Sequence, residues 1–246
     1  GQFRLNRGGQ GFYRVQYEGE LRTEMTQLAT TLPAEERYAV VSDLWANVLA
    51  GDVSAGDFLH LAGEFKDERE PEVWGAIIGG LGELNRVVSS DDRPALQQFV
   101  RDLVAPAADR MGWEPRPDET DLDRRLRGLL LRTRGVLGDD QMMLPEARAV
   151  FDATIAGESI DGEVAAAALA IVAANGGPAE FAGFIDAYRK AASPQDEVRY
   201  LQAAIAVPEH DTAEQVLDML TRGEIRRQDG GWVTARLIGH RTTGVD

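Results

Sequence analysis

From Glu20 onward the apolar side chains recur with the period of an α-helix, and this periodicity constrains the fold more than any other feature of the sequence. In four separate segments apolar residues occupy positions i, i+3, i+4 and i+7, the spacing that places them on one helix face. The four sets are Val41, Leu44, Trp45 and Val48; Phe58, Leu61, Ala62 and Phe65; Leu96, Phe99, Val100 and Leu103; and Ala213, Val216, Leu217 and Leu220.

Start signals accompany several of these segments. Ser54 precedes Asp57 by three residues and Asp211 precedes Glu214 by three, which is the spacing of a capping box. The pair Ser193-Pro194 combines a good N-cap residue with a proline suited to the first helical position. Together the start and stop signals predict about twelve helices.

Taken in pairs, these helices form hairpins that follow one another at intervals of about 35 residues. Their first helices are expected to begin near Glu20, Ser54, Asp91, Met143, Pro178 and Asp211. One interval is longer because it contains Ala105 to Asp121, where Pro106, Pro115 and Pro117 predict an inserted loop. We therefore predict an all-α fold, a superhelical α-solenoid of HEAT or armadillo type built from stacked helical hairpins.

The N-terminal residues follow a different pattern. Phe3-Arg4-Leu5 and the run from Phe12 to Tyr17 are β-prone and alternate polar with apolar residues, and the turn-rich run from Arg7 to Gly11 separates them. We expect a short β segment over residues 1–18, followed by a helical domain over residues 19–246.

The composition excludes several classes of function. The chain of 246 residues has no cysteine, which rules out disulfides and thiolate sites and favours a reducing compartment, so a cytoplasmic location is expected. With 41 acidic and 26 basic residues, its net charge of -15 argues against a nucleic-acid partner. No apolar run approaches the roughly 20 residues of a membrane-spanning helix, so no membrane partner is expected.

A search for catalytic or metal-binding motifs finds none. His60, His210 and His240 lack the His-Glu-x-x-His spacing that aims two zinc ligands from one helix face. His60 is interpreted as a half-buried helix residue, and the run Gly79 to Gly82 as a site of close helix packing or a helix end. We expect no catalytic residue, no metal ligand and no cofactor in this chain.

The densest basic stretch has two interpretations. Read as function, it is an anion or carboxylate site; read as structure, it is a solvated helix face neutralised by flanking acidic residues. The second interpretation is favoured because acidic residues flank the stretch on both sides. The basic residues are Arg124, Arg125, Arg127, Arg132 and Arg134, and the acidic ones are Asp121, Asp123, Asp139 and Asp140.

Several stretches, in order, resemble the C-terminal helical domain of zinc aminopeptidases of the aminopeptidase N and puromycin-sensitive aminopeptidase family. They are the junction Leu5 to Tyr17, the segments Glu36 to Asp43 and Ala50 to Val53, the segment Glu68 to Trp74, the pair Met111-Gly112-Trp113 and Leu126-Arg127, and the segment Gly223 to Asp229. The resemblance implies a fragment that starts at the last strand of a preceding β-sandwich and ends before the final helices. The family's zinc site would lie in a catalytic domain upstream, and no residue here matches one of its ligands.

The resemblance further implies a non-catalytic domain that caps the active-site cleft and helps enclose and select peptide substrates. Its partners would be the catalytic domain of the same polypeptide and the peptides themselves. A stand-alone α-solenoid that binds a protein partner is the alternative, and an independent all-α enzyme has little support. Which side chains would contact the peptide is not predicted.

One contact is predicted between distant residues. Arg14 and Asp43 both lie beside apolar residues and both match family motifs, so we expect them to pair and tie the N-terminal segment to the first helical layer. Tyr13, Arg14 and Asp43 are thus candidate structural anchors. The alternative is two independent surface charges, since exposed ion pairs contribute little.

Overall fold

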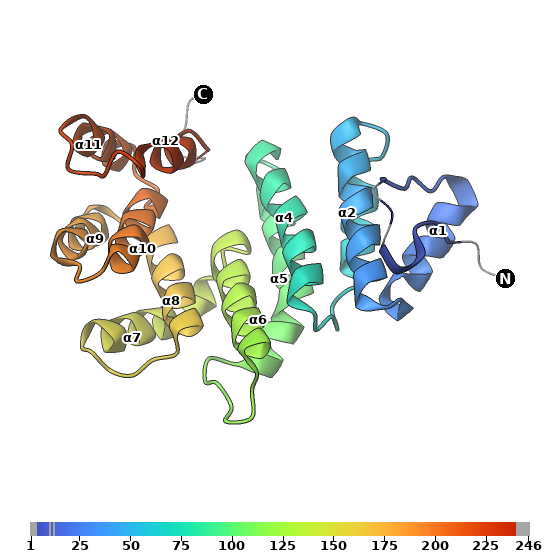
Figure 1. The fold of residues 1–246 in the computed structure, drawn as a ribbon, viewed down its shortest axis with the longest axis horizontal. Coiled ribbons are helices and arrows are strands. Elements are labelled where there is room, and N and C mark those ends of the chain that lie inside the picture. Colours follow the sequence, from blue (N-terminus) through green and yellow to red (C-terminus); the bar gives the residue numbers. More distant parts are fainter. Residues whose placement is uncertain (1–3, 10, 12, 240–246) are drawn as a thin grey trace. The chain divides into compact units, whose positions relative to one another are not determined.

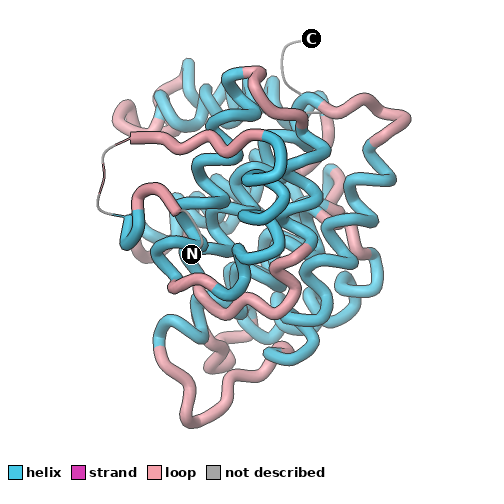
Figure 2. The backbone as a smooth tube through the Cα atoms, turned by 90° about the vertical axis from the view of Figure 1, so that its right-hand side faces the viewer, coloured by secondary structure: helices cyan, strands magenta, loops and turns pink. Residues whose placement is uncertain are grey.

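The computed structural model describes residues 4–9, 11 and 13–239, and these residues are helical or irregular throughout (Figures 1 and 2). The chain divides into two compact units, Gly1–Asp139 and Asp140–Asp246. The first contains α1 (Gly19–Leu28), α2 (Ala34–Ala50), α3 (Ala55–Gly63), α4 (Pro71–Val87), α5 (Arg93–Met111) and α6 (Asp121–Arg132), which continues as a π-helical turn (Thr133–Leu137). The second contains α7 (Leu144–Ile155), α8 (Gly162–Ala174), α9 (Pro178–Lys190), α10 (Pro194–Ala206), α11 (His210–Thr221) and α12 (Gly230–Gly239). Short 3-10 turns span Arg7–Gly9, Ala29–Thr31 and Gln141–Met143.

The odd-numbered helices begin close to the predicted hairpin starts, at Gly19, Ala55, Arg93, Leu144, Pro178 and His210. Within the first unit α2 packs against α4, and α4 packs against α6. Within the second unit α8 packs against α10, and α10 packs against α12. In each unit the even-numbered helices therefore follow one another as packed neighbours.

Two predicted helix starts are confirmed in atomic detail. The Ser54 hydroxyl oxygen accepts a hydrogen bond from the backbone N–H of Asp57. The Asp57 carboxylate accepts one from the backbone N–H of Ser54, which completes a capping box. Ser193 caps α10 by accepting from the Asp196 amide. The predicted cap at Asp211 is wrong, because α11 already begins at His210 and Asp211 lies in its first turn.

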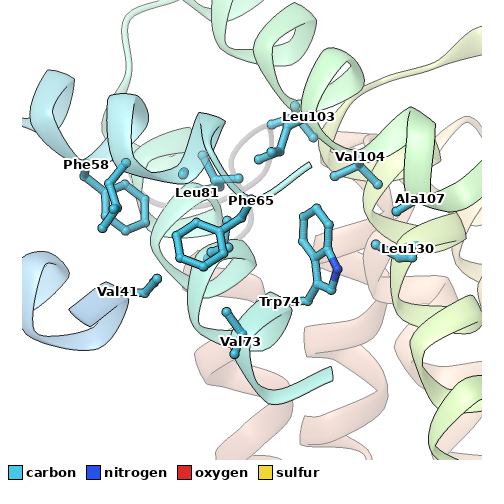
Figure 3. Packing of buried hydrophobic residues seen from close by; sticks show 14 of the residues in the cluster. Val41, Phe58, Phe65, Val73, Trp74, Leu81, Leu103, Val104, Ala107 and Leu130 are labelled. Atoms are coloured by element: carbon cyan, nitrogen blue, oxygen red, sulfur yellow. The ribbon is translucent and has the colours of Figure 1, made fainter. Parts of the chain in front are cut away.

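The core of the first unit is aromatic and aliphatic (Figure 3). Trp74 on α4 is completely buried, and its indole nitrogen donates to the Glu68 carbonyl oxygen at 3.1 Å. Phe58 packs so closely on Gly80 that a Cβ atom built there would lie 2.5 Å from the phenyl ring. The predicted reason for glycine in this stretch, close helix packing, is confirmed at Gly80.

In the described part of the second unit, α8 has the most buried residues of any helix, and its sequence is mostly alanine and valine. Its alanine side chains are short enough for the helix backbones to approach closely, and α7 and α10 both pack against it. Eight of its residues are buried: Val164, Ala165, Ala167, Ala168, Leu169, Ile171, Val172 and Ala173.

The predicted N-terminal β segment is not supported among the described residues. Arg7–Gly9 form a 3-10 turn in which Gly8 adopts φ 76°, and residues 14–18 are irregular. The backbone N–H groups of Leu5 and Asn6 donate to the hydroxyl oxygens of Tyr17 and Tyr13 instead of to a neighbouring strand. A strand needs a ladder partner, and here side chains take that role. Phe3 and Phe12, which belong to the predicted strands, lie outside the described residues.

The predicted inserted loop is shorter than expected. Helix α5 continues through Pro106 to Met111, so only residues 112–120 form the loop. A proline removes one helical hydrogen bond, and at this exposed position the packing of Ala107 and Ala108 into the core offsets that loss.

Candidate functional site

The N-terminal segment is held against α2 by polar side chains on one face of that helix. Asp43 accepts two hydrogen bonds, from Arg14 Nη1 at 3.0 Å and from the backbone N–H of Val15 at 3.2 Å. One helical turn later, the Asn47 side-chain amide donates to the carbonyl oxygen of Val15 at 3.1 Å. Both backbone groups of the buried Val15 are thus paired with side chains of α2, as a neighbouring strand would pair them.

Arg14 and Asp43 therefore pair as the sequence predicts, but the two ends of the pair differ in exposure. The Arg14 side chain is 62% exposed and the Asp43 side chain 11%. Arg14 also donates to the Ser42 hydroxyl oxygen at 2.7 Å. Since the guanidinium remains in water, the ion pair itself contributes little, and the backbone N–H bond to Asp43 is the stronger restraint.

A second acidic side chain of α2 reinforces the segment, and sequence reasoning missed it. The buried Glu36 accepts from Arg4 Nη1 at 2.8 Å and from the backbone N–H of Gly8 at 3.2 Å. Glu36 and Asp43 lie seven residues apart, which places them on the same helix face. That spacing, next to an N-terminal segment rich in arginine, is the signal that could have revealed this anchor.

A groove of about 950 Å³ lies beside this anchor, between the N-terminal segment, α2 and the start of α4. Tyr13 and Tyr38 line it and are 54% and 47% exposed. Its other side chains include Glu35, Glu70 and Glu72, so the groove combines aromatic rings with carboxylates. Such a surface suits a cationic or amphipathic polar chain, because both rings and carboxylates attract positive charge.

The basic stretch on α6 is only partly a solvated face. Arg127 is completely buried, with a 0% exposed side chain. Both of its terminal nitrogens donate to the Glu119 carboxylate, and its Nε donates to the Gly112 carbonyl oxygen at 3.1 Å. The interpretation of this stretch as a solvated face is wrong for Arg127. The guanidinium closes the loop between α5 and α6, a contact between chain segments that helical periodicity does not reveal.

Another buried carboxylate lies between α3 and α4. Glu68 accepts from Arg37 Nε at 2.6 Å and Nη2 at 2.8 Å, and from the backbone N–H groups of Arg69 and Glu70. Burial opposes ionisation of this carboxyl, but these bonds outweigh it and lower the pKa of Glu68 below its usual value. At Glu119 the hydrogen bonds from Arg127 lower the pKa in the same way.

Comparison with known proteins assigns the family. A family model described as the ERAP1-like C-terminal domain matches residues 3–245. The chain belongs to this family. The matched residues include the N-terminal anchor, the groove and the Arg127 contact described above.

The curated relatives of this ERAP1-like C-terminal domain are aminopeptidases. Aminopeptidase M1-A of Oryza sativa subsp. japonica is 29% identical over 92% of this chain and 27% of its own length. The puromycin-sensitive aminopeptidase of Caenorhabditis elegans is 25% identical over 92% of this chain and 24% of its own length. The alanine/arginine aminopeptidase of Saccharomyces cerevisiae is 25% identical over the same share of this chain. The chain thus spans about a quarter of the length of the relatives it matches.

The residues that the structure describes form no cluster that fits a zinc site. Within residues 4–9, 11 and 13–239, no group of three or more His, Asp or Glu side chains is placed to hold a metal ion. His60 lies on α3 and is exposed, not half-buried as predicted, and His210 begins α11. His240 lies outside the described residues. None of the helices in the described part of the chain is both long and apolar enough to cross a bilayer.

Proposed function

We propose that this chain is the non-catalytic C-terminal domain of a zinc aminopeptidase, and that it caps the active-site cleft and helps enclose and select peptide substrates. The observation that supports this most strongly is the family match over residues 3–245, combined with relatives that are about four times as long. Zinc would be held by the catalytic domain of the same polypeptide, since the described residues here offer no ligand set.

The packing within each unit supports the enclosing role. Consecutive even-numbered helices are in contact, which is the pattern of stacked helical pairs. Stacked pairs curve and create concave surfaces, so we propose a superhelical solenoid for the domain. Residues 1–18 would then be the end of a preceding β-sandwich domain, at its junction with the helical domain over residues 19–246. The cytoplasmic location stays a prediction.

The groove beside the N-terminal anchor supports a role toward peptides. Tyr38 presents an exposed ring, and Glu35 and Glu70 add negative charge that attracts the amino groups of a peptide. An aminopeptidase acts on chains with a free, positively charged amino end, so attraction of such chains toward the cleft would raise their encounter rate.

The test compares substrates of different length in the parent polypeptide. Variants Glu35→Gln and Glu70→Gln together should lower kcat/KM for a decapeptide while leaving that for a single aminoacyl amide unchanged, because the short substrate does not reach this domain. Glu83→Gln on the exposed surface of α4 is the matched control. An equal effect on both substrates, or none on either, would contradict the enclosing role and favour the stand-alone scaffold.

A second experiment addresses catalysis by the isolated chain. Incubated with zinc and fluorogenic aminoacyl amides, the chain should show no turnover that survives purification. Turnover that disappears on replacing His60, His210 or His240 would overturn the non-catalytic assignment.

A further inference from the structure

A second pocket, in the first unit, differs from the acidic groove in charge and in size. It has a volume of about 290 Å³ and lies where the loops 64–70 and 112–120 meet the end of α5 and the start of α6. Three arginine side chains line it, Arg69, Arg110 and Arg116. Two carboxylates, Glu68 and Asp123, also line it, so arginines outnumber acidic residues here although the whole chain has a net charge of -15.

These arginines keep much of their hydrogen-bonding capacity. Among the described residues, the Arg69 guanidinium has no hydrogen bond and no ion pair. In the part of the chain that the structure describes, Arg110 pairs with Asp67 alone, at 3.3 Å, and water screens this contact because the Asp67 side chain is 98% exposed. Arg116 donates from Nε to Glu119 at 3.2 Å, which leaves both of its terminal nitrogens available.

The acidic side chains at this pocket are already engaged. Glu68 accepts four hydrogen bonds, two of them from Arg37. Asp123 accepts from the backbone N–H and the hydroxyl of Thr120, where it completes the capping box of α6. Neither carboxylate is directed at the arginines by any of these bonds. Most of the unmatched polar groups at the pocket are therefore guanidinium N–H donors, although one oxygen of Asp123 also has no hydrogen bond in the described part of the chain.

A buried ion pair fixes the loop that carries Arg116. Buried Arg127 binds Glu119 through two parallel bonds, and Glu119 in turn accepts from Arg116. The loop between α5 and α6 is thus fixed at its base before any ligand arrives. Because the backbone that carries Arg116 is ordered in advance, less entropy is lost there when an anion binds.

The floor of the pocket is apolar. Ala107, Leu126 and Leu130 are buried core residues that also line this pocket, and Met111 adds a half-buried thioether side chain. Guanidinium groups above an apolar floor match a molecule with one anionic end and one hydrophobic end. Inorganic phosphate would bind only the arginines and would leave the apolar residues of the pocket in contact with water.

We propose that this arginine pocket binds a small organic carboxylate that carries an apolar group. Arginine pairs with carboxylates through two parallel N–H bonds, and the apolar group covers the floor formed by α5 and α6. These residues differ from those that support the enclosing role. Failure of one proposal therefore leaves the other unaffected.

The experiment titrates the isolated chain with N-acetyl-leucine and follows the arginine Nε–Hε signals by NMR. The signals of Arg69 and Arg116 should shift, and the neutral N-acetyl-leucinamide should bind at least about tenfold more weakly, because one charge-assisted bond is worth about that factor. A hexapeptide ending in a free leucine carboxylate distinguishes a pocket for small acids from one that receives the end of a chain. Binding of either acid supports the proposal.

Variants make the result specific. Arg69→Gln should weaken binding about tenfold, since it removes the unpaired donor without disturbing a native contact. Arg86→Gln removes another exposed arginine, on α4 and outside the pocket, and should leave binding unchanged. Arg116→Gln serves if Arg69→Gln does not fold. Equal binding of acid and amide, equal losses in the Arg69 and Arg86 variants, or no shift at all would overturn the proposal.

Discussion

In their described residues the two compact units each contain six α-helices, yet different side chains stabilise them. In the described part of the first unit, the buried and paired charged side chains include Glu36, Asp43, Glu68, Glu119 and Arg127. In the described part of the second unit the only buried charged side chain is Asp229, which accepts from Arg226 and from the Trp232 indole. The second unit relies instead on alanines of α8.

This difference shows that helices of similar length can be joined in two ways. Where a loop or irregular segment must be fixed to a helix, a buried charge supplies the donors or acceptors that the backbone lacks. Where helices pack directly on one another, small side chains and shape complementarity suffice. The first unit contains irregular segments at residues 13–18, 64–70 and 112–120, and the bonds of Asp43, Glu68 and Arg127 fix these segments.

The largest effect is expected at Arg127. Arg127→Ala leaves the buried Glu119 carboxylate without its partner and should lower the free energy of unfolding by about 3–5 kcal/mol. Denaturant unfolding followed by circular dichroism measures this. The control is Arg125→Ala, which removes an exposed pair to Glu72 and should cost no more than about 1 kcal/mol. Similar losses in the two variants would show that buried charge does not distinguish the first unit.

In the second unit, stability should depend most on the volume of the buried side chains of α8. Ala168 is completely buried on α8, so Ala168→Leu should cost about 1–3 kcal/mol by overpacking the contacts with its neighbours. The matched control is Ala166→Leu on the exposed face of the same helix, which should be close to neutral. If both substitutions are equally tolerated, close packing of α8 does not hold this unit together.

Asp43 provides a finer test within the first unit. Asp43→Ala leaves the Val15 N–H unpaired and should cost about 1–3 kcal/mol, whereas Arg14→Ala should cost less than about 1 kcal/mol because its guanidinium is exposed. Hydrogen exchange at the Val15 amide should accelerate only in the Asp43 variant. Faster exchange in the Arg14 variant would mean that the ion pair, and not the backbone bond, holds the segment.

The smallest effect on stability is expected from a change of pH. Hydrogen bonds lower the pKa of Glu68, Glu119 and Asp123 in the first unit, and of Glu180 in the second. A carboxyl group whose pKa is lower in the folded state stabilises the fold at any pH above its unfolded-state pKa. That stabilisation is lost as the pH falls through the folded-state pKa. Acidification below about pH 4 should therefore destabilise the first unit more than the second.

The indole NMR signals report the two units separately during such a titration. Trp45, Trp74 and Trp113 belong to the first unit and Trp232 to the second. The signals of the first three should broaden or shift before that of Trp232. If the Trp232 signal is lost first, the second unit is the more acid-sensitive of the two and the prediction is wrong.

The sequence by itself determined the helices and their order. Apolar spacing and capping residues such as Ser54 and Ser193 act within a few residues, so their effects are visible without knowledge of distant contacts. The pairing of Arg14 with Asp43 could also be predicted, because each lies in a motif that resembles the same family. Glu36 could have been found by its seven-residue spacing from Asp43.

Only the tertiary structure decided the conformation of the N-terminal segment and the environment of Arg127. A run that alternates polar with apolar residues has no intrinsic preference between a strand and an extended segment on a helix, because the outcome depends on which groups satisfy its backbone. Here side chains of α2 do so for Val15. Arg127 is one of several arginines in its stretch, and only the return of the loop that contains Glu119 buries it. Burial of a charge depends on what lies opposite in space, and no local pattern encodes that.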